Sequence, residues 1–291
     1  MPPPSRLLQR AAPAKVNLGL HVLRRRPDGY HDVETVLLPI GWHDTLTAGL
    51  TEPGAPFRFT CSDPALPTDE RNLCVRAAHA LAAEAGIEPY GTLHLDKHVP
   101  YGAGLGGGSS DAAVTLRLMA ELWDVAPSAE ELHDLAAALG SDVPFFLHDG
   151  PMRATGRGDV LRPLDAEYHF PFALAVVMPP VRVGTAGAYR QVTPHADGRP
   201  DLGALVRSND LARWRRGLTN DFEAPVLARY PEVARVKADL TAAGAGYAAL
   251  SGSGAAVFGV FEAVEEARAA AESATEEGLR AWWGRPGGGA G

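Results

Sequence analysis

A segment near the start of the chain shows the two-residue alternation of a β-strand. In residues 15–22 every second position is hydrophobic, and the positions between them are Lys15, Asn17, Gly19 and His21. Because successive side chains of a strand point to opposite faces, this pattern predicts a strand with one apolar and one polar face, with Lys15 and Asn17 on the same face. Arg-Pro-Asp-Gly at residues 26–29 predicts a turn, and residues 33–40 a second apolar strand.

The pattern changes from strand to helix across a glycine-rich segment. Residues 92–96 alternate apolar and polar side chains, whereas Val114, Leu118 and Leu122 recur at helical spacing. A further helix is predicted at residues 128–139. These patterns place the glycines between a strand and the N-terminus of a helix.

Local signals mark both ends of the helix at residues 128–139. Ser128 and Glu131 have the spacing of a capping box, and Gly140 is expected to end the helix. Pro144 disfavours the α conformation at the preceding Val143, so residues 141–144 are expected to form a tight turn that contains an aspartate.

The chain changes character beyond about residue 151. Strands are predicted at residues 172–178 and 250–258, and helices at 231–243 and 262–277. We therefore expect an α+β protein with an N-terminal domain at residues 1–155, a C-terminal domain at 156–283 and a disordered tail at 284–291. Ser-Gly-Ser-Gly at 251–254 is either a bulge or a close crossing of two backbones, or a second loop that reaches bound phosphates.

Composition limits the classes of function. With 291 residues and 46% hydrophobic content, the chain is long enough for two domains with buried cores. Its net charge of −8 argues against a nucleic-acid partner. No segment approaches the roughly 18 apolar residues of a membrane span. The two cysteines lack metal-site or disulfide spacing, which favours a soluble protein of the reducing cytoplasm.

The glycine-rich segment is predicted to bind phosphates. Glycines allow an anion to approach main-chain N–H groups, and the helix that follows presents unpaired N–H groups at its start. No lysine follows the glycines, as it does in a Walker A loop, and a dinucleotide fold or a flexible linker fits the context less well. The candidate residues are Pro100, Tyr101, Gly102, Ala103, Gly104, Leu105, Gly106, Gly107, Gly108, Ser109 and Ser110.

Two further sets of residues have both a functional and a structural interpretation. Asp142 either makes the local hydrogen bonds of a turn or accepts a proton beside the glycine loop. Tyr30 and His31, which follow the turn at 26–29, either pack against the sheet or hold a flat heterocycle. From their spacing alone, packing is the simpler interpretation.

Taken together, these motifs resemble the GHMP small-molecule kinases. Beside the glycine loop, they are Ala-Pro-Ala-Lys-Val-Asn-Leu at 12–18, Arg-Pro-Asp-Gly-Tyr-His at 26–31, Leu-Gly-Ser-Asp-Val-Pro-Phe at 139–145, Asn-Asp-Phe-Glu at 220–223 and the segment 251–254, all in family order. The Asp-Gly-Tyr-His corner is similar to that of family members whose substrate is a cytidine diphosphate-linked methylerythritol.

The resemblance implies a fold and a reaction. It implies a ribosomal-protein-S5-like N-terminal domain, a ferredoxin-like C-terminal domain, and transfer of the γ-phosphoryl group of ATP to the 2-hydroxyl of the methylerythritol, with Mg²⁺, in isoprenoid precursor biosynthesis. Asp142 would accept the hydroxyl proton and Lys15 would stabilise negative charge. The substrate-binding residues it implies are Asn17, Tyr30, His31, Thr185 and Tyr189.

Two alternative functions stay open, and the sequence does not identify the metal ligands. One is a related GHMP kinase for another small alcohol, and the other a non-catalytic nucleotide-binding module of the same fold. The sequence differs from relatives at Gly184, where Ser or Pro is frequent, and at Tyr101, where an aliphatic residue is usual. No position matches the acidic magnesium ligand of some family members.

Overall fold

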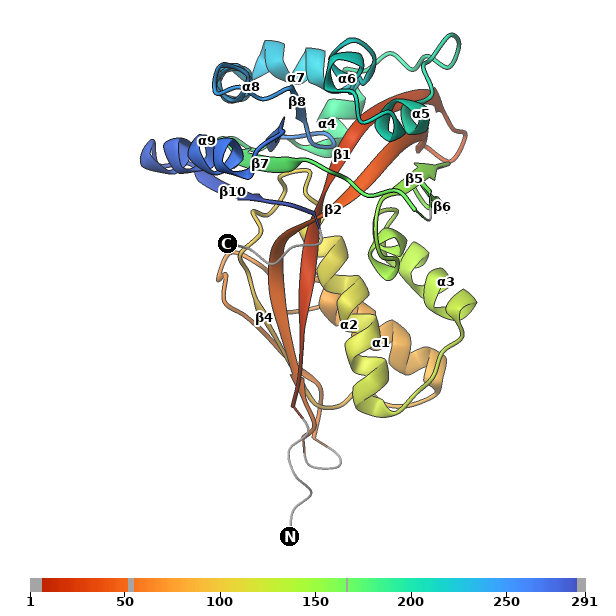
Figure 1. Cartoon of the computed structure of the whole chain (residues 1–291). Coiled ribbons are helices and arrows are strands. Elements are labelled where there is room, and N and C mark those ends of the chain that lie inside the picture. Colours follow the sequence, from red (N-terminus) through yellow and green to blue (C-terminus); the bar gives the residue numbers. More distant parts are fainter. Residues whose placement is uncertain (1–6, 52–54, 166, 287–291) are drawn as a thin grey trace. The chain divides into compact units, whose positions relative to one another are not determined.

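The computed structural model describes residues 7–51, 55–165 and 167–286 (Figure 1). They form two compact units, each assembled from separate stretches of the chain. The first unit contains the described residues up to Ala14, His43–Val99 and Gly107–His148, and the second contains Lys15–Trp42, Pro100–Gly106 and the described residues from Asp149 onward. The units are therefore not consecutive in sequence, and the predicted boundary after residue 155 stays a prediction.

The two strands predicted near the start are present and longer than expected. Strand β1 spans Leu7–Arg25 and β2 spans His31–Gly49, and they pair with each other. In the turn between them the amide of Arg26 donates a 2.8 Å hydrogen bond to the carbonyl of Tyr30, and Gly29 has a φ of +87°. Glycine tolerates this left-handed conformation because it has no Cβ atom.

The polar face of β1 is buried, which its alternating pattern does not reveal. Lys15 and Asn17 are each 3% exposed and His21 is fully buried. Polar side chains in such places need hydrogen-bond partners, because an unpaired buried polar group costs about 1–3 kcal/mol. This strand therefore carries polar chemistry inside the protein.

In the first unit, the second half of β2 pairs antiparallel with β4, which in turn pairs parallel with β3. Three helices lie side by side in this unit (Figure 1). Ser128 and Glu131 form the predicted capping box at the start of α3, and Gly140 caps its end. The elements are β3 (Arg58–Cys61), α1 (Leu73–Ala85), β4 (Thr92–Asp96), α2 (Gly107–Trp123), α3 (Ala129–Leu139) and the 3₁₀ helix η1 (Pro144–Leu147).

In the second unit, the first half of β2 pairs with β5, which pairs with β6. Four other strands form an antiparallel sheet in the order β10-β7-β9-β8. The elements are β5 (Met152–Thr155), β6 (Val160–Pro163), β7 (Ala173–Met178), α4 (Thr185–Tyr189), α5 (Leu202–Arg207), α6 (Leu211–Gly217), α7 (Glu223–Arg229), α8 (Pro231–Ala242), β8 (Tyr247–Leu250), β9 (Val257–Phe261), α9 (Val264–Glu276) and β10 (Arg280–Gly284).

The four-stranded sheet has the ferredoxin-like arrangement that the resemblance implies. Helix α8 lies between β7 and β8 in the chain, α9 lies between β9 and β10, and both helices pack on the sheet (Figure 1). This is the β-α-β-β-α-β order of that fold. Residues such as Val177, Val236, Leu240, Val257 and Phe261 form its core.

Three local expectations were wrong. Residues 250–258 are not one strand, because a turn at 251–256 separates β8 from β9. Val143 adopts the α conformation in spite of Pro144, since it is the N-cap residue of η1. Gly284 belongs to β10 rather than to a tail, and residues 287–291 of the predicted tail lie outside the described residues.

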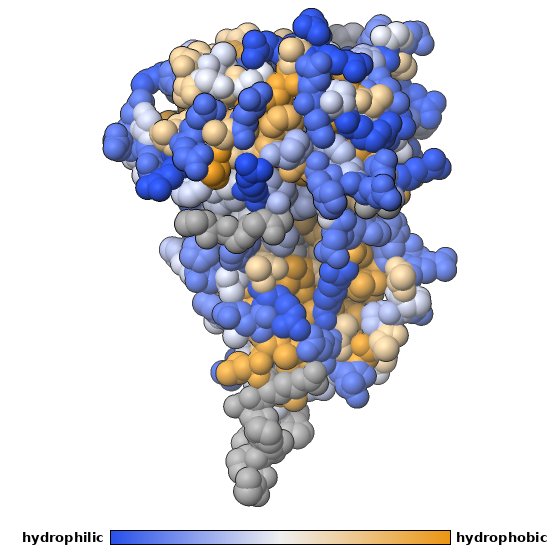
Figure 2. All heavy atoms as spheres, viewed as in Figure 1, coloured by the Kyte–Doolittle hydropathy of each residue, from blue (hydrophilic) through white to orange (hydrophobic). Residues whose placement is uncertain are grey.

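The surface seen in Figure 2 is largely hydrophilic, with smaller hydrophobic areas between the polar residues. The described residues include five large hydrophobic side chains that are strongly exposed, and two of them, Tyr30 (54%) and Tyr101 (58%), are candidate binding residues. The other three are Leu7, Leu50 and Val160. Among the described residues, no helix has the length and hydrophobicity needed to cross a membrane.

Candidate active site

Lys15 is the central residue of a buried hydrogen-bond chain in the second unit. Its Nζ atom donates to Oδ1 of Asn17 at 2.7 Å and to the carbonyl oxygen of Gly104 at 2.9 Å. Asn17 donates in turn to Oγ1 of Thr35 at 3.0 Å, and Thr35 donates to the carbonyl of Gly19 at 2.6 Å. The strand therefore fixes an ammonium group directly against the glycine loop, as a site for an anionic ligand requires.

The glycine motif has two structural parts. Pro100–Gly106 is a loop of the second unit, and the helix α2 of the first unit begins at Gly107. Gly102, Gly104 and Gly106 have φ values of +68°, +77° and +71°. Every second residue of the loop is thus left-handed, a conformation that only glycine adopts at little cost. The glycines are required by the loop's backbone shape as well as by access to the main chain.

The segment 251–254 is a second loop that packs on the first. Oγ of Ser251 donates to the carbonyl of Gly104 at 2.9 Å, and the amide of Ala256 donates to the carbonyl of Ala103 at 3.0 Å. A Cβ atom on Gly104 would lie 2.1 Å from the carbonyl oxygen of Ser251, so the two backbones touch where no side chain fits. The segment is thus a loop and also a close approach of two backbones. Contact with phosphates stays a prediction.

Asn220 fixes the second loop through side-chain hydrogen bonds. No role was assigned to this residue from the sequence. Its side chain is 6% exposed and donates to the carbonyls of Leu250 and Gly252 at 2.9 and 2.8 Å. It also accepts a 3.0 Å bond from the amide of Phe222. Asn-Asp-Phe-Glu was part of the resemblance, but only the fold shows that its asparagine shapes the loop. Thr35 was likewise missed, whereas Ser251 was named only as part of the segment 251–254.

The predicted ring-bearing residues take part in two different contacts. The ring of His31 stacks on Tyr189 with centroids 4.6 Å apart and an interplanar angle of 18°. Tyr189 also meets Phe222 edge to face at 4.8 Å. Tyr30 instead lies under the guanidinium of Arg157, whose carbon is 5.2 Å from the ring centroid. The structure therefore brings His31 and Tyr189 together directly and leaves the Tyr30 ring at the surface.

The charge of His31 suits a hydrogen-bonding role. Burial, and secondarily the positive charge of Arg25, lower the pKa of the imidazole from 6.5. The ring is therefore neutral at physiological pH and has one donor and one acceptor nitrogen. Thr185, on the same short helix as Tyr189, lies 3.2 Å from Ser253, oxygen to oxygen.

Asp142 is partly buried in the turn between α3 and η1, in the first unit. Gly140 ends α3 before it, and the amide of Val143 donates to the carbonyl of Gly140 at 3.1 Å. The carboxylate thus sits on a short, well-defined turn, as predicted. Its proximity to Lys15 stays a prediction.

The first turn of α2 contains a buried hydroxyl suited to a cation. Ser110 is fully buried, and its Oγ atom has no hydrogen-bond partner within the described residues. No group of three His, Cys, Asp or Glu side chains among those residues is placed to hold a metal. Mg²⁺ in kinases takes one or two protein oxygens and completes its shell with phosphates and water, so a single serine hydroxyl fits this ion.

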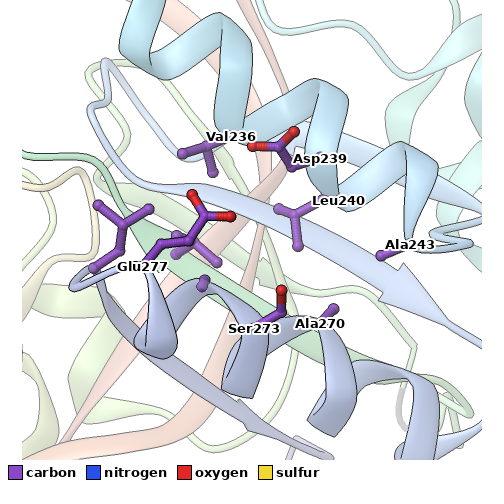
Figure 3. A pocket seen from close by; sticks show the side chains of 10 residues that line it. Val236, Asp239, Leu240, Ala243, Ala270, Ser273 and Glu277 are labelled. Atoms are coloured by element: carbon purple, nitrogen blue, oxygen red, sulfur yellow. The ribbon is translucent and has the colours of Figure 1, made fainter.

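A separate pocket lies between α8 and α9 in the second unit (Figure 3). Val236 and Leu240 of α8 and Ala270 of α9 line it, with Asp239 and Glu277 close by. Its volume of about 60 Å³ is far below the roughly 300 Å³ at which ligand pockets begin. None of the predicted site residues lines it, and we assign it no part in the site.

Known proteins are similar to this chain along most of its length. The chain matches the family models described as GHMP kinases N terminal domain, over residues 72–150, and GHMP kinases C terminal, over residues 202–278. It is 54% identical over 277 residues to the 4-diphosphocytidyl-2-C-methyl-D-erythritol kinase of Salinibacter ruber, covering 94% of this chain and 96% of that protein. The enzyme of the same name from Chlorobium limicola is 46% identical over 272 residues, covering 92% of this chain and 93% of that protein.

Solved structures give the same result. A crystal structure of 4-(cytidine 5'-diphospho)-2C-methyl-D-erythritol kinase is similar with a TM-score of 0.81 and 37% identity, over 97% of this chain and 100% of that one. Methanococcus jannaschii mevalonate kinase has a TM-score of 0.74 at 14% identity, over 99% and 100% of the two chains, and shares the fold. Matched models of both domains, and relatives that align along almost the whole length, show that this chain belongs to the GHMP kinase family.

Proposed function

We propose that the chain transfers the γ-phosphoryl group of ATP to the 2-hydroxyl of 4-diphosphocytidyl-2-C-methyl-D-erythritol, giving the 2-phosphate and ADP in isoprenoid precursor biosynthesis. Its relatives with 42–54% identity bear the name of that kinase. The observation that carries the proposal is the position of Lys15, whose ammonium group joins the glycine loop to Asn17 inside the protein. The glycine loop and Lys15 form a site for an anion, and Asn17, which can orient a polar substrate, contacts Lys15 directly.

The chemical step needs one proton acceptor and good alignment. The substrate oxygen forms a bond to the γ-phosphorus while the bond from that phosphorus to the β–γ bridging oxygen breaks, and ADP leaves. Asp142 accepts the hydroxyl proton. Lys15 stabilises the negative charge that develops, and its bonds to Gly104 and Asn17 fix its position before reaction, so little reorganisation is needed.

The phosphates of ATP bind along residues 100–110. The left-handed glycines expose main-chain N–H groups, and the start of α2 adds the positive end of a helix dipole. Ser110 would hold Mg²⁺, which neutralises charge on the phosphates when bound. The buried, unpartnered Ser110 hydroxyl supports this assignment.

The cytosine ring is bound by the aromatic residues of the second unit. The stacked pair of His31 and Tyr189 offers a flat surface and imidazole hydrogen bonds, and the exposed ring of Tyr30 offers a further face. Asn17 orients the methylerythritol, and Thr185 lies on the helix that carries Tyr189. We further place the reaction in the cytoplasm, which two free cysteines support.

The test is ADP release from Mg·ATP by the purified protein, with and without the cytidine substrate, beside an Asp142→Asn variant. Release that depends on the substrate and is lost in the variant is expected. ATP binding without substrate-dependent release would contradict the cytidine assignment and lead to a panel of other small alcohols. Absence of ATP binding would contradict the kinase assignment.

A further inference from the structure

A buried cluster of three ionisable groups lies where the glycine loop leaves and rejoins the first unit. Nζ of Lys97 lies 2.5 Å from Oδ2 of Asp44 and 2.9 Å from Oδ2 of Asp111. The side chains of Lys97, Asp44 and Asp111 are 5%, 0% and 3% exposed. Lys97 directly follows β4, Asp44 lies in the second half of β2, and Asp111 lies in the first turns of α2. We refer to these three residues as the ion cluster.

The cluster fixes the chain just before the loop. Oδ1 of Asp44 accepts hydrogen bonds from the amides of His98 and Val99 at 2.5 and 2.8 Å. Val99 is followed directly by Pro100, the first loop residue. One carboxylate thus binds the Lys97 ammonium with one oxygen and the two amides ahead of the loop with the other.

The cluster also fixes the chain just after the loop. Asp111 lies one helical turn beyond Gly107, where α2 begins. A Cβ atom on Gly107 would lie 3.4 Å from both Oδ2 of Asp44 and Nζ of Lys97, and 3.2 Å from Cγ1 of Val99. The backbone after the loop therefore lies against the same charges that hold the backbone before it.

The charges of the ion cluster affect the pKa values of Lys97 and Asp111. Burial opposes the charge of Lys97, but Asp111 and Asp44 outweigh that effect and raise its pKa. Burial raises the pKa of the Asp111 carboxyl, and the ammonium group of Lys97 opposes that shift. Oδ1 of Asp111 has no hydrogen-bond partner within the described residues.

Burying three ionisable side chains costs free energy of desolvation, so their presence calls for a structural reason. Burying an ion pair costs several kcal/mol per ion in desolvation by typical estimates, and apolar residues often give equal stability, so retained ionic groups are best explained where they specify one conformation. Here the conformation is the closing of a seven-residue loop, Pro100–Gly106, onto fixed ends.

We propose that Lys97 is a positioning residue for ATP, which joins Asp44 and Asp111 so that the two ends of the glycine loop are held at the spacing that nucleotide phosphates require. The proposal rests on the proposed function, because it assumes that the loop binds ATP. Lys97 acts through the loop and does not touch the phosphates.

The experiment is direct titration of purified variants with ATP in a calorimeter, without the second substrate. Lys97→Met removes both ion contacts, and Asp111→Ala removes the helix contact alone. Asp111→Asn keeps an oxygen acceptor for Lys97. We expect Kd for ATP to rise about tenfold or more in the first two variants and to stay within about twofold in the third, since lost preorganisation weakens binding.

Three controls make the result decisive. Arg10→Met breaks a surface ion pair with Glu121 that also joins β1 to α2, and it should leave Kd unchanged. Each titration is repeated with and without Mg²⁺, because loss of a metal ligand would change only the Mg²⁺-dependent part, whereas a misplaced loop weakens both. Thermal unfolding records stability separately, and if Lys97→Met does not fold, the two Asp111 variants decide.

The proposal is overturned if Asp111→Ala lowers the melting temperature but binds ATP as tightly as the parent protein. It is also overturned if Asp111→Asn weakens binding as much as Asp111→Ala. Failure of the parent protein to bind ATP would instead contradict the proposed function, so the two failures are distinguishable.

Discussion

The Nζ atom of Lys15 donates a 2.9 Å hydrogen bond to the carbonyl oxygen of Gly104, 89 residues further along the chain. The same carbonyl accepts a 2.9 Å bond from Oγ of Ser251, 147 residues beyond Gly104. Two donors from distant segments thus hold one peptide group of the glycine loop. A peptide held in this way is preorganised for a ligand before the ligand arrives, which is how protein dipoles stabilise charge most effectively.

Replacing this lysine tests its role in charge stabilisation. Lys15→Met keeps much of the buried volume but removes the ammonium group. We expect kcat to fall by roughly 10²–10³-fold, the effect typical of losing one electrostatic contact to a transition state. Steady-state ADP release measures it, and circular dichroism confirms that the variant is folded. A folded variant with near-normal turnover would remove Lys15 from the reaction.

The contact between the two loops is tested by a pair of alanine substitutions. A Cβ atom on Gly104 would lie 2.1 Å from the carbonyl oxygen of Ser251, whereas one on Gly102 would have nothing within 4 Å. Both glycines have positive φ values, +77° and +68°. Gly102→Ala should therefore cost only the left-handed penalty of about 1–2 kcal/mol, and Gly104→Ala should cost clearly more because the loops must separate.

Urea unfolding measures both free energies, and nucleotide titration shows whether the loop still binds. We expect Gly104→Ala to lose most ATP affinity. Equal unfolding free energies for the two variants would show that the contact between the loops is not maintained in solution.

The exposed ring of Tyr30 should contribute to substrate affinity but not to ATP affinity. Stacking of an aromatic side chain on a base is worth about 1–3 kcal/mol, so Tyr30→Leu should raise KM for the cytidine substrate by about tenfold or more. Tyr30→Phe keeps the ring and serves as the matched control, with KM near that of the parent protein. The KM for ATP should not change in either variant. Indifference to Tyr30→Leu would favour a substrate without cytidine.

The buried His21 should make the protein sensitive to acid. Burial, with a smaller effect of Arg199, lowers the pKa of its imidazole below 6.5, and Nδ1 has no partner within the described residues. Below pH 6.5 the unfolded chain therefore binds a proton that the folded chain does not, and the free energy of unfolding falls as the pH drops from 6.5 toward the lower folded-state pKa.

His21→Asn removes this proton uptake while keeping a polar group near Thr219, whose hydroxyl lies 3.2 Å from Nε2 of His21. Urea unfolding at pH 7.5 and pH 5 should show a smaller difference in free energy for the variant than for the parent protein. The same difference in both proteins would assign the acid sensitivity to other groups.

Much of the local structure could be predicted from the sequence. Alternation identified β1 and β4, and helical spacing identified α2, because side-chain periodicity is set by backbone geometry alone. Strand β2 was identified as an apolar run that follows a turn. The capping box of Ser128 and Glu131 and the turn before Tyr30 depend on hydrogen bonds between residues only a few positions apart. The glycine loop was likewise recognisable, since left-handed residues and phosphate contacts both select glycine.

The positions of the side chains that form the site were decided by the tertiary structure. Alternation placed Lys15 and Asn17 on one face of β1 but could not show that this face is buried, since burial depends on what packs against it. The stack of His31 on Tyr189 and the contact of Gly104 with Ser251 join residues more than 140 positions apart. Val143 adopts the conformation that Pro144 disfavours, because it is the N-cap residue of η1. Local preferences are worth about 1 kcal/mol or less per residue, so long-range packing and paired buried polar groups override them where the site is formed.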